Sequence, residues 1–544
     1  MATNKHWWQK TTIYQVYPRS FKDTNTDGIG DLQGIISKLD YIKELGFETI
    51  WISPFFQSPQ QDWGYDVSDY LNIAPEYGDL SDVVRLIHEI HQRDMYILFD
   101  FVLNHTSDQH PWFQESRSSR KSPKRDWYIW RDGQGSRAPN NWKAQIGRSG
   151  WNFDPGTDQW YYASFLPFQP DLNFRNPDVK EAMFNIARYW LDKGVDGFRL
   201  DIFHCLFKDE YFRDNPWSYH LLPQNSMAGF FQDWKYNINQ QDTIQFAHDF
   251  RKVIDSYTPE RMLLGELFGD DDMIRDYLGE DQKGLHLVFS WDLMDLKLKA
   301  GHFRDIIRHY ETEFPAPYTP VLVLGNHDRK RLVSRLGENT RLAKLLTLYQ
   351  FTLRGIPVTY YGDEIGMSDV HIPGKYAKDP VGKLYKWIPE FISDNLNIYL
   401  NRDRCRTPMQ WDKSENAGFS KPGVNPWLPI HHNFTHVNVR SEALDEKSFL
   451  NIYKDLLFIR RESKAIQEGT IELINCPDNE DQLLAFKRQS EQEVALVLIN
   501  LSGTDCIFNN KTECRHAVFQ IGSHDISSEG QIRINPWSGL ILST

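Results

Sequence analysis

The chain has few of the features that mark secreted, disulfide-linked or membrane proteins. Its 544 residues include five cysteines, and their spacing fits neither a zinc site nor a disulfide framework. No apolar run approaches the ~18 residues that cross a bilayer. The N-terminus has no apolar segment of the kind found in signal peptides. We therefore expect a cytoplasmic protein with no membrane partner.

Clusters of basic residues are also absent. Lys and Arg total 61 against 74 Asp and Glu, which gives a formal net charge of -13. Such a chain would be repelled by a phosphate backbone, so nucleic acid is not an expected partner. Aromatic residues, in contrast, make up 14% of the chain. Aromatic faces fill large cores and also stack on sugar rings. The sequence does not indicate an oligomeric state.

Short β-branched or aromatic runs alternate with segments of helical period, such as 80–93 with Val83, Ile87 and Ile90 on one face. Alternating strands and helices predict a parallel sheet, and eight such units predict an α/β fold with a closed (β/α)8 TIM barrel. The eight predicted strands are Ile13–Val16, Thr49–Ile52, Tyr96–Phe101, Gly197–Asp201, Met262–Glu266, Leu285–Phe289, Val321–Gly325 and Pro357–Tyr361.

Two stretches interrupt this alternation. A segment rich in Trp, Gly, Pro and Asn follows strand 3 and predicts an inserted subdomain, and an irregular stretch at about 368–434 follows strand 8. Beyond Gly469, short alternating runs predict an antiparallel β domain with strands at Thr470–Ile474, Gln482–Lys487, Val494–Asn500, His516–Ile521 and Gln531–Ile534. The expected domains are a barrel (1–104 and 174–465), an inserted subdomain (105–173) and a C-terminal β-sandwich (466–544).

Acidic residues lie at the carboxyl ends of predicted strands, where TIM barrels carry their chemistry: Asp100, Asp201, Glu266 and, just past a strand, Asp328. Arg199 lies two residues before Asp201, so both side chains point to the same side of the strand. A neighbouring guanidinium favours the ionised carboxylate that a nucleophile needs. A structural ion pair is the commoner role of an isolated pair of this kind, and only its neighbours argue for catalysis.

Four motifs occur in a fixed order: Asp-x-Val-x-Asn-His at 100–105, Gly-Phe-Arg-x-Asp at 197–201, a strand ending at Glu266, and Asn-His-Asp at 326–328. Together with Gly64-Tyr65-Asp66 and Arg-Thr-Pro-Met-Gln-Trp at 406–411, they resemble the α-amylase superfamily (glycoside hydrolase family 13). The likeness is to its exo-acting α-glucosidase and oligo-1,6-glucosidase branch. It covers residues from about 8 to 465 and is weaker in the C-terminal β domain.

The resemblance implies a retaining glycosidase. Asp201 would be the nucleophile, with Arg199 beside it, and Glu266 the general acid and then base. Asp328 would hold the 2- and 3-hydroxyls of the glucose that is cleaved. The resemblance also implies that His105 and His327 hydrogen-bond the same sugar and that Tyr65 stacks beneath it. No catalytic cofactor is expected.

Asp62 and Arg402 match the residues that, in the exo-acting branch, bind the hydroxyls of the non-reducing glucose and close the pocket. A surface ion pair is the alternative for each. If the resemblance holds at both positions, the protein removes single glucose units from short chains and does not cut polymers internally.

Linkage preference stays open between α-1,4 and α-1,6 bonds. In the family, Val after the nucleophile accompanies α-1,6 bonds, and Ala or Thr accompanies α-1,4 bonds. Here the residue is Ile202, which is β-branched but bulkier. The segment 145–149 also departs from the family pattern, so the aromatic wall of the pocket would come from Phe165 or Phe168.

A separate motif at 23–31 is typical of calcium loops. It places oxygen-bearing side chains at alternate positions around Gly28, which allows a sharp turn. Members of the branch bind Ca²⁺ or Mg²⁺ in the corresponding loop, and hard oxygen donors suit Ca²⁺. A polar turn without an ion is the alternative. The expected ligands of this structural ion are Asp23, Asn25, Asp27, the Ile29 carbonyl and Asp31.

Two other functions are compatible with parts of the sequence. A transglucosidase or sucrose isomerase, of the trehalulose, isomaltulose or trehalose synthase type, would use the same residues and differ in the acceptor. A silent scaffold like the barrel ectodomains of amino-acid transporters is the third hypothesis. Such scaffolds lack catalytic carboxylates and carry a membrane anchor, whereas this sequence has all three carboxylates.

Overall fold

The barrel predicted from the sequence is present. The computed structural model describes residues 6–221, 227–389, 393, 398–527 and 530–544. Eight parallel strands close into a single barrel in sequence order, each hydrogen-bonded to the next. They are β1 (Ile13–Val16), β2 (Thr49–Ile52), β5 (Tyr96–Phe101), β9 (Gly197–Leu200), β12 (Met262–Gly265), β13 (Leu287–Ser290), β14 (Val321–Val323) and β15 (Ile356–Tyr360). The strand expected at Leu285–Phe289 is shifted by two residues at its start.

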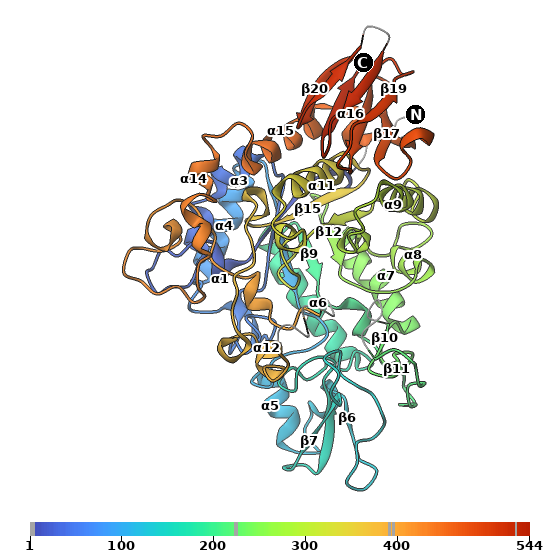
Figure 1. Cartoon of the computed structure of the whole chain (residues 1–544). Coiled ribbons are helices and arrows are strands. Elements are labelled where there is room, and N and C mark those ends of the chain that lie inside the picture. Colours follow the sequence, from blue (N-terminus) through green and yellow to red (C-terminus); the bar gives the residue numbers. More distant parts are fainter. Residues whose placement is uncertain (1–5, 222–226, 390–392, 394–397, 528–529) are drawn as a thin grey trace.

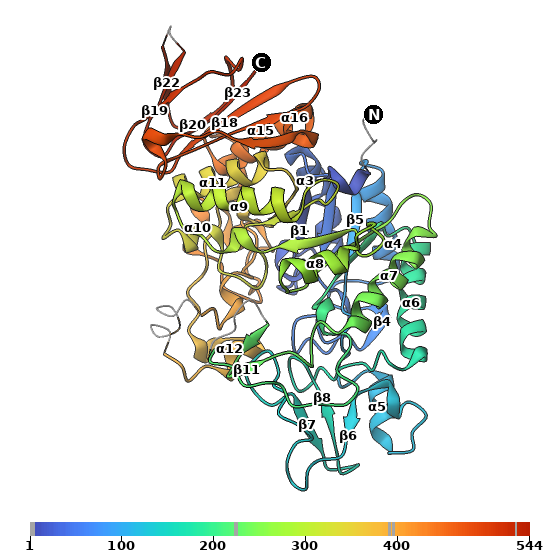
Figure 2. The same ribbon diagram turned by 90° about the vertical axis from the view of Figure 1, so that its right-hand side faces the viewer.

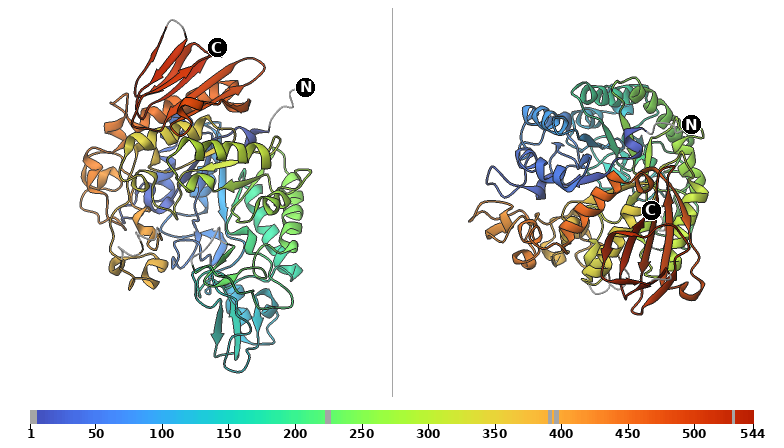
Figure 3. Two further views of the ribbon diagram at one scale, coloured as in Figure 1. Left: turned by 45° about the vertical axis from the view of Figure 1, so that its right-hand side comes forward. Right: turned by 90° about the horizontal axis from the view of Figure 1, so that it is seen from above.

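Helices surround the barrel, as Figure 3 shows from above. Their apolar faces follow from helical spacing: in α4, Val83, Leu86, Ile87 and Ile90 are buried, and Asp79 caps the first turn. The principal helices are α3 (Leu39–Leu45), α4 (Leu80–His91), α6 (Pro177–Asp192), α7 (Gln241–Asp255), α8 (Asp271–Leu278), α9 (Ala300–Glu313), α11 (Thr340–Thr352) and α15 (Phe449–Glu462). In the part of the chain that the structure describes, none of the helices is both long and apolar enough to cross a bilayer.

Shorter elements connect this framework. The short helices are α1 (Pro18–Phe21), α2 (Leu32–Ile36), α5 (Pro111–Ser118), α10 (Leu332–Arg335), α12 (Pro380–Leu384), α14 (Val439–Glu442) and α16 (Lys464–Glu468). Two small strand pairs accompany them, β3 (Phe56–Gln57) with β4 (Asp69–Ile73) and β10 (Ala228–Gly229) with β11 (Gln232–Asp233).

Side chains fill the interior of the barrel. Strand residues such as Ile13, Trp51, Leu264 and Val358 form one buried cluster, and Trp8 packs against it. A filled interior leaves no channel through the barrel, so a site can form only at its rims.

The inserted subdomain follows β5, the third barrel strand. It contains β6 (Trp130–Arg131), β7 (Trp151–Asp154) and β8 (Gln159–Tyr162), hydrogen-bonded in the order β6-β8-β7. Trp142, Trp151 and Tyr162 are buried in a small core of its own. In Figure 1 this subdomain lies at the end of the molecule opposite the C-terminal strands.

The C-terminal region forms two antiparallel sheets, in the orders β16-β17-β18-β23-β20 and β19-β22-β21 (Figure 2). Apolar residues of both sheets, including Leu498, Phe508 and Ile532, share one core. The strands are β16 (Thr470–Leu473), β17 (Leu483–Gln489), β18 (Val494–Asn500), β19 (Cys506–Asn509), β20 (His516–Ile521), β21 (His524–Ile526), β22 (Gln531–Ile534) and β23 (Gly539–Ser543). The sequence analysis missed β19, β21 and β23.

Candidate functional site

The strand register brings the two candidate catalytic carboxylates together. Leu200 of β9 pairs with Gly265 of β12, so the residues that follow them, Asp201 and Glu266, leave the barrel side by side. The Glu266 N–H donates to the Leu200 carbonyl at 2.9 Å and fixes this alignment. Asp201 and Glu266 are 6% and 7% exposed, so each keeps a small open surface at the carboxyl-end rim.

One buried guanidinium forms ion pairs with three carboxylates at this rim. Arg199 Nη1 lies 3.0 Å from Asp201 Oδ1 and 2.7 Å from Asp100 Oδ1, while Nη2 lies 2.5 Å from Glu266 Oε2. Asp100 faces Arg199 across the β5–β9 register. The sequence analysis noted Asp100 as a strand-end acid but gave it no role; here it is the third member of the cluster.

The shared guanidinium does not fully offset the effect of burial on the pKa values of Asp201 and Asp100. Burial raises the pKa of Asp201 well above its ordinary value; Arg199 opposes the shift, and Glu266 and Asp100 add to it. Burial likewise raises the pKa of Asp100 to about 6. Arg199 thus lowers the pKa of Asp201, as a neighbouring guanidinium is expected to do, but burial has the larger effect.

Tyr65 and His327 lie in parallel beside this cluster, with ring centroids 5.3 Å apart. Gln15 Nε2 donates to His327 Nδ1 at 2.8 Å, so the proton of the neutral ring is on Nε2, which donates to Tyr65 Oη at 2.6 Å. Tyr65 in turn donates to Asp100 at 3.1 Å. Burial lowers the pKa of His327 to about 3, which keeps the ring neutral. Gln15 was not found from the sequence.

His105, the other predicted sugar ligand, contacts the main chain of Tyr65. Its Nε2 is 3.1 Å from the Tyr65 carbonyl, and it is buried. Burial lowers the pKa of His105 to about 4, so this ring is also neutral at pH 7.

A second arginine, Arg402, brings the remaining predicted residues together. Its Nη2 lies 2.6 Å from Asp62 and its Nη1 lies 3.3 Å from Asp328. Arg406 reaches the same Asp328 oxygen at 2.6 Å. Burial acts to raise the pKa of Asp328. His327, which becomes charged only at low pH, and the permanently charged Arg402 and Arg406 outweigh burial and hold this pKa well below its ordinary value. Asp328 is thus the strongly ionised acid of the site.

Two residues discussed for linkage border the same rim. Ile202 has a left-handed backbone (φ 32°, ψ 46°), which is strained for a β-branched residue, and its N–H donates to Glu266 Oε2 at 3.2 Å. Its side chain packs against the buried cluster of Cys205, Trp234 and Ile238. Phe165 lies over Arg402, 5.8 Å from the guanidinium carbon, and packs with Phe168 in a cluster that includes Leu384.

The predicted metal loop forms a tight turn that directs its acids toward its own backbone. Asp23 accepts from two loop N–H groups at 2.7 and 3.0 Å, and Asp31 accepts from its own loop and caps α2. Gly28 is left-handed, as the predicted turn requires (φ 87°). Among the described residues, no group of three or more His, Cys, Asp or Glu is arranged to hold a metal ion. The donor set itself is all oxygen, which fits Ca²⁺ chemically.

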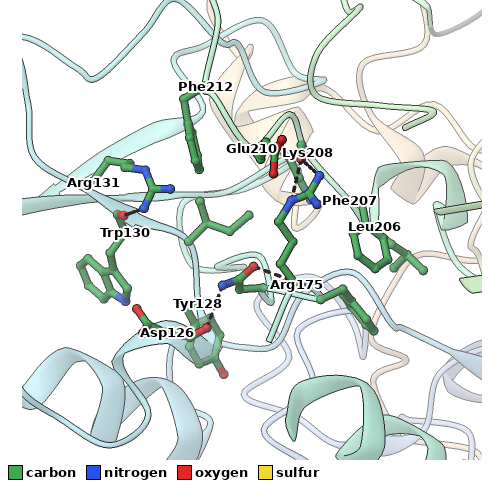
Figure 4. A pocket seen from close by; sticks show the side chains of 13 residues that line it. Asp126, Tyr128, Trp130, Arg131, Arg175, Leu206, Phe207, Lys208, Glu210 and Phe212 are labelled. Carbon is green, nitrogen blue, oxygen red and sulfur yellow. Dashed lines mark hydrogen bonds between the residues drawn. The ribbon is translucent and has the colours of Figure 1, made fainter. Parts of the chain in front are cut away.

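A cavity of about 140 Å³ lies elsewhere, between the inserted subdomain and the segment after β9 (Figure 4). Arg175 spans it and donates to the Lys208 carbonyl at 2.8 Å, and Arg131 lies over the Phe212 ring. None of the predicted site residues lines it. The candidate site is the carboxyl-end rim, not this cavity.

Comparison with known proteins agrees with the motifs. Residues 15–469 match the family described as the alpha amylase catalytic domain. An oligo-1,6-glucosidase of Parageobacillus thermoglucosidasius is 35% identical, with 98% of each chain covered. An alpha-glucosidase of Schizosaccharomyces pombe is also 35% identical, covering 93% of this chain and 92% of that protein.

Two solved enzyme structures have the same fold. The alpha-glucosyl transfer enzyme XgtA is 34% identical with a TM-score of 0.88, covering 99% of this chain and 100% of the other. The trehalulose synthase MutB from Pseudomonas mesoacidophila MX-45 is 32% identical with a TM-score of 0.89, with the same coverage.

Proposed function

The chain belongs to the alpha-amylase family of glycoside hydrolases, and from this premise we infer that it is an exo-acting α-glucosidase. The substrates are short oligosaccharides and disaccharides with a terminal α-linked glucose. The observation that carries the proposal is the pair Asp201 and Glu266, which follow neighbouring strands and share Arg199. Glycosidases typically use two adjacent carboxyl groups, one as the general acid and the other as the nucleophile or base.

The proposed reaction is a double displacement. Asp201 attacks the anomeric carbon while Glu266 gives its proton to the departing oxygen, which leaves a glucosyl ester on Asp201. Glu266 then takes a proton from water, and the water oxygen displaces Asp201 with net retention. Asp328, strongly ionised, would bind two ring hydroxyls of the same glucose.

The proposal of exo action rests on the closed end of the pocket. Asp62 and Arg402 form a buried ion pair beside Asp328. We propose that this pair blocks the direction in which an extended sugar chain would continue. We propose that this pair binds the hydroxyls of the terminal glucose, with Phe165 lining the pocket and Tyr65, His105 and His327 around the sugar.

Hydrolysis of both α-1,4 and α-1,6 bonds is our proposal for linkage, since Ile202 matches neither family pattern. Transfer or sucrose isomerisation would use the same carboxylates and is the second candidate, favoured by the fold shared with XgtA and MutB. The domain limits at 104, 173 and 465 and the cytoplasmic location stay predictions.

The proposed function is tested by product analysis on maltose, isomaltose, sucrose and maltoheptaose, with Asp201→Asn as the blank. We expect glucose from the short substrates and no internal cleavage of maltoheptaose. Asp201→Asn should lower kcat by at least about 10³-fold, because it removes the nucleophile. New disaccharides from sucrose would indicate the transferase instead, and unchanged hydrolysis by Asp201→Asn would refute the assignment.

The pH profile tests the shared-cation cluster. Because burial raises the pKa of Asp201, the nucleophile stays protonated to a higher pH than an exposed Asp. The acidic limb of kcat/KM should therefore lie above the ordinary Asp value of about 3.9, and activity should fall as pH drops through it. Asp100→Asn removes one competing anion and should move this limb to lower pH. A limb at or below the ordinary value would contradict the electrostatic account.

We propose that the loop 23–31 binds a structural Ca²⁺ or Mg²⁺ through Asp23, Asn25, Asp27, the Ile29 carbonyl and Asp31. The ion would hold the segment between β1 and α2 and take no part in the reaction. Exhaustive chelation should lower the melting temperature, and Ca²⁺ should restore it, since an ion bound only by the folded state stabilises it. Asp27→Asn should weaken the response. A melting temperature that chelation leaves unchanged would count against the site.

A further inference from the structure

Asp379 is a buried carboxylate behind Arg402. It lies at the N-terminus of α12 in the irregular stretch after β15, and it is fully buried. Its Oδ1 accepts from Nε and Nη2 of Arg402 at 3.1 and 2.7 Å. Its Oδ2 accepts from the Arg402 backbone N–H at 2.9 Å. Asp379 therefore fixes both the main chain and the plane of the guanidinium.

The contacts divide the guanidinium into two sides. Nε and Nη2 of Arg402 donate to Asp379. On the proposed pocket side, Nη2 also contacts Asp62 and Nη1 contacts Asp328. Burial acts to raise the pKa of Asp379, but Arg402 holds it below its ordinary value, so this partner is ionised. Having no exposed surface, Asp379 does not itself reach the sugar.

A reciprocal contact holds Asp379 in place. Asp403, the residue after Arg402, accepts the backbone N–H groups of Lys378 and Asp379 at 2.6 and 3.0 Å. The two neighbouring segments thus hold each other through two carboxylates. In addition, Val381 and Leu384 of α12 pack in the same cluster as Phe165.

We propose that Asp379 is a positioning residue that orients Arg402 at the closed end of the pocket and so determines the selection of a terminal glucose. The inference rests on the proposed function and deepens it. When hydroxyls of the substrate bind Asp62 and Asp328, the contact between Arg402 and Asp379 remains and keeps the guanidinium in the same orientation. Without it, Arg402 would be free to rotate away from the sugar.

The test compares kcat and KM on p-nitrophenyl α-glucoside and on its 4-deoxy analogue. The 4-hydroxyl is the position through which an α-1,4 chain would continue, so it is the group that the closed end must recognise. For Asp379→Asn we expect kcat/KM on the glucoside to fall about 10- to 100-fold, as a misplaced binding group does. The value of kcat/KM on the 4-deoxy substrate should fall much less. The ratio of kcat/KM on the glucoside to kcat/KM on its 4-deoxy analogue should therefore decrease.

Two further variants separate positioning from folding. Asp379→Glu keeps the negative charge, so its ratio of kcat/KM values on the two substrates should stay closer to the wild-type ratio than that of Asp379→Asn. Asp196→Asn is the matched control: Asp196 is a buried acid paired with Arg261 and His91 just before β9, at the opposite end of the barrel. It should lower stability and leave the ratio unchanged.

A double-mutant cycle with Arg402→Ala completes the test. If Asp379 acts through Arg402, the double variant should show no larger loss of kcat/KM on the glucoside than Arg402→Ala alone. An unchanged ratio in Asp379→Asn, or losses that add in the double variant, would overturn the inference while leaving the α-glucosidase intact. A wild-type chain that releases no glucose from either substrate would overturn the proposed function and this inference with it.

Discussion

The candidate site depends on one buried cation, Arg199, held among three carboxylates from three adjacent strands. A charge that is 1% exposed is tolerable only with ionic partners, and each acid in turn depends on the same guanidinium. The parallel register makes this arrangement possible, since Asp100 faces Arg199 across one strand pair and Asp201 and Glu266 follow another. Burial raises the pKa values of Asp201 and Asp100, and the neighbouring acids add to the effect, whereas Arg199 opposes it.

A second arginine cluster forms the other half of the pocket. Arg402 lies among Asp62, Asp328 and Asp379, and here the acids Asp328 and Asp379 are held strongly ionised. His327 connects the halves, because its neutral ring contacts both Tyr65 and Asp328. The two clusters thus supply different chemistry: acids with raised pKa values, Asp201 and Asp100, at the proposed reaction centre, and ionised carboxylates at the proposed hydroxyl-binding end.

The parts of the fold with local signals could be predicted. Barrel strands such as Thr49–Ile52 and Tyr96–Phe101 were found at their observed limits, because β-branched and aromatic residues predominate in each. The C-terminal β19 and β21 are short and mixed in polarity, so they carried little signal. Strand β23 is a clear apolar run, Gly539–Ser543, and its omission was an error of interpretation.

The candidate site could be predicted where motifs identify it and not where contacts join distant loops. Asp62 and Arg402 were found by resemblance, and they lie 2.6 Å apart although 340 residues separate them. Gln15 and Asp379 belong to no motif that we recognised, and their roles depend on side-chain directions that spacing does not encode. The left-handed backbone of Ile202 is equally invisible in the sequence, since β-branched residues rarely adopt it.

The most direct test of the account is to trap the proposed glucosyl ester. A 5-fluoro-α-glucosyl fluoride slows the second displacement more than the first, and peptide mass spectrometry of the labelled protein then locates the sugar. The account predicts a single adduct on Asp201 that forms in Asp379→Asn more slowly than in the wild type. A label on Asp100, Glu266 or Asp328, or turnover of a true substrate without any trapped ester, would contradict it.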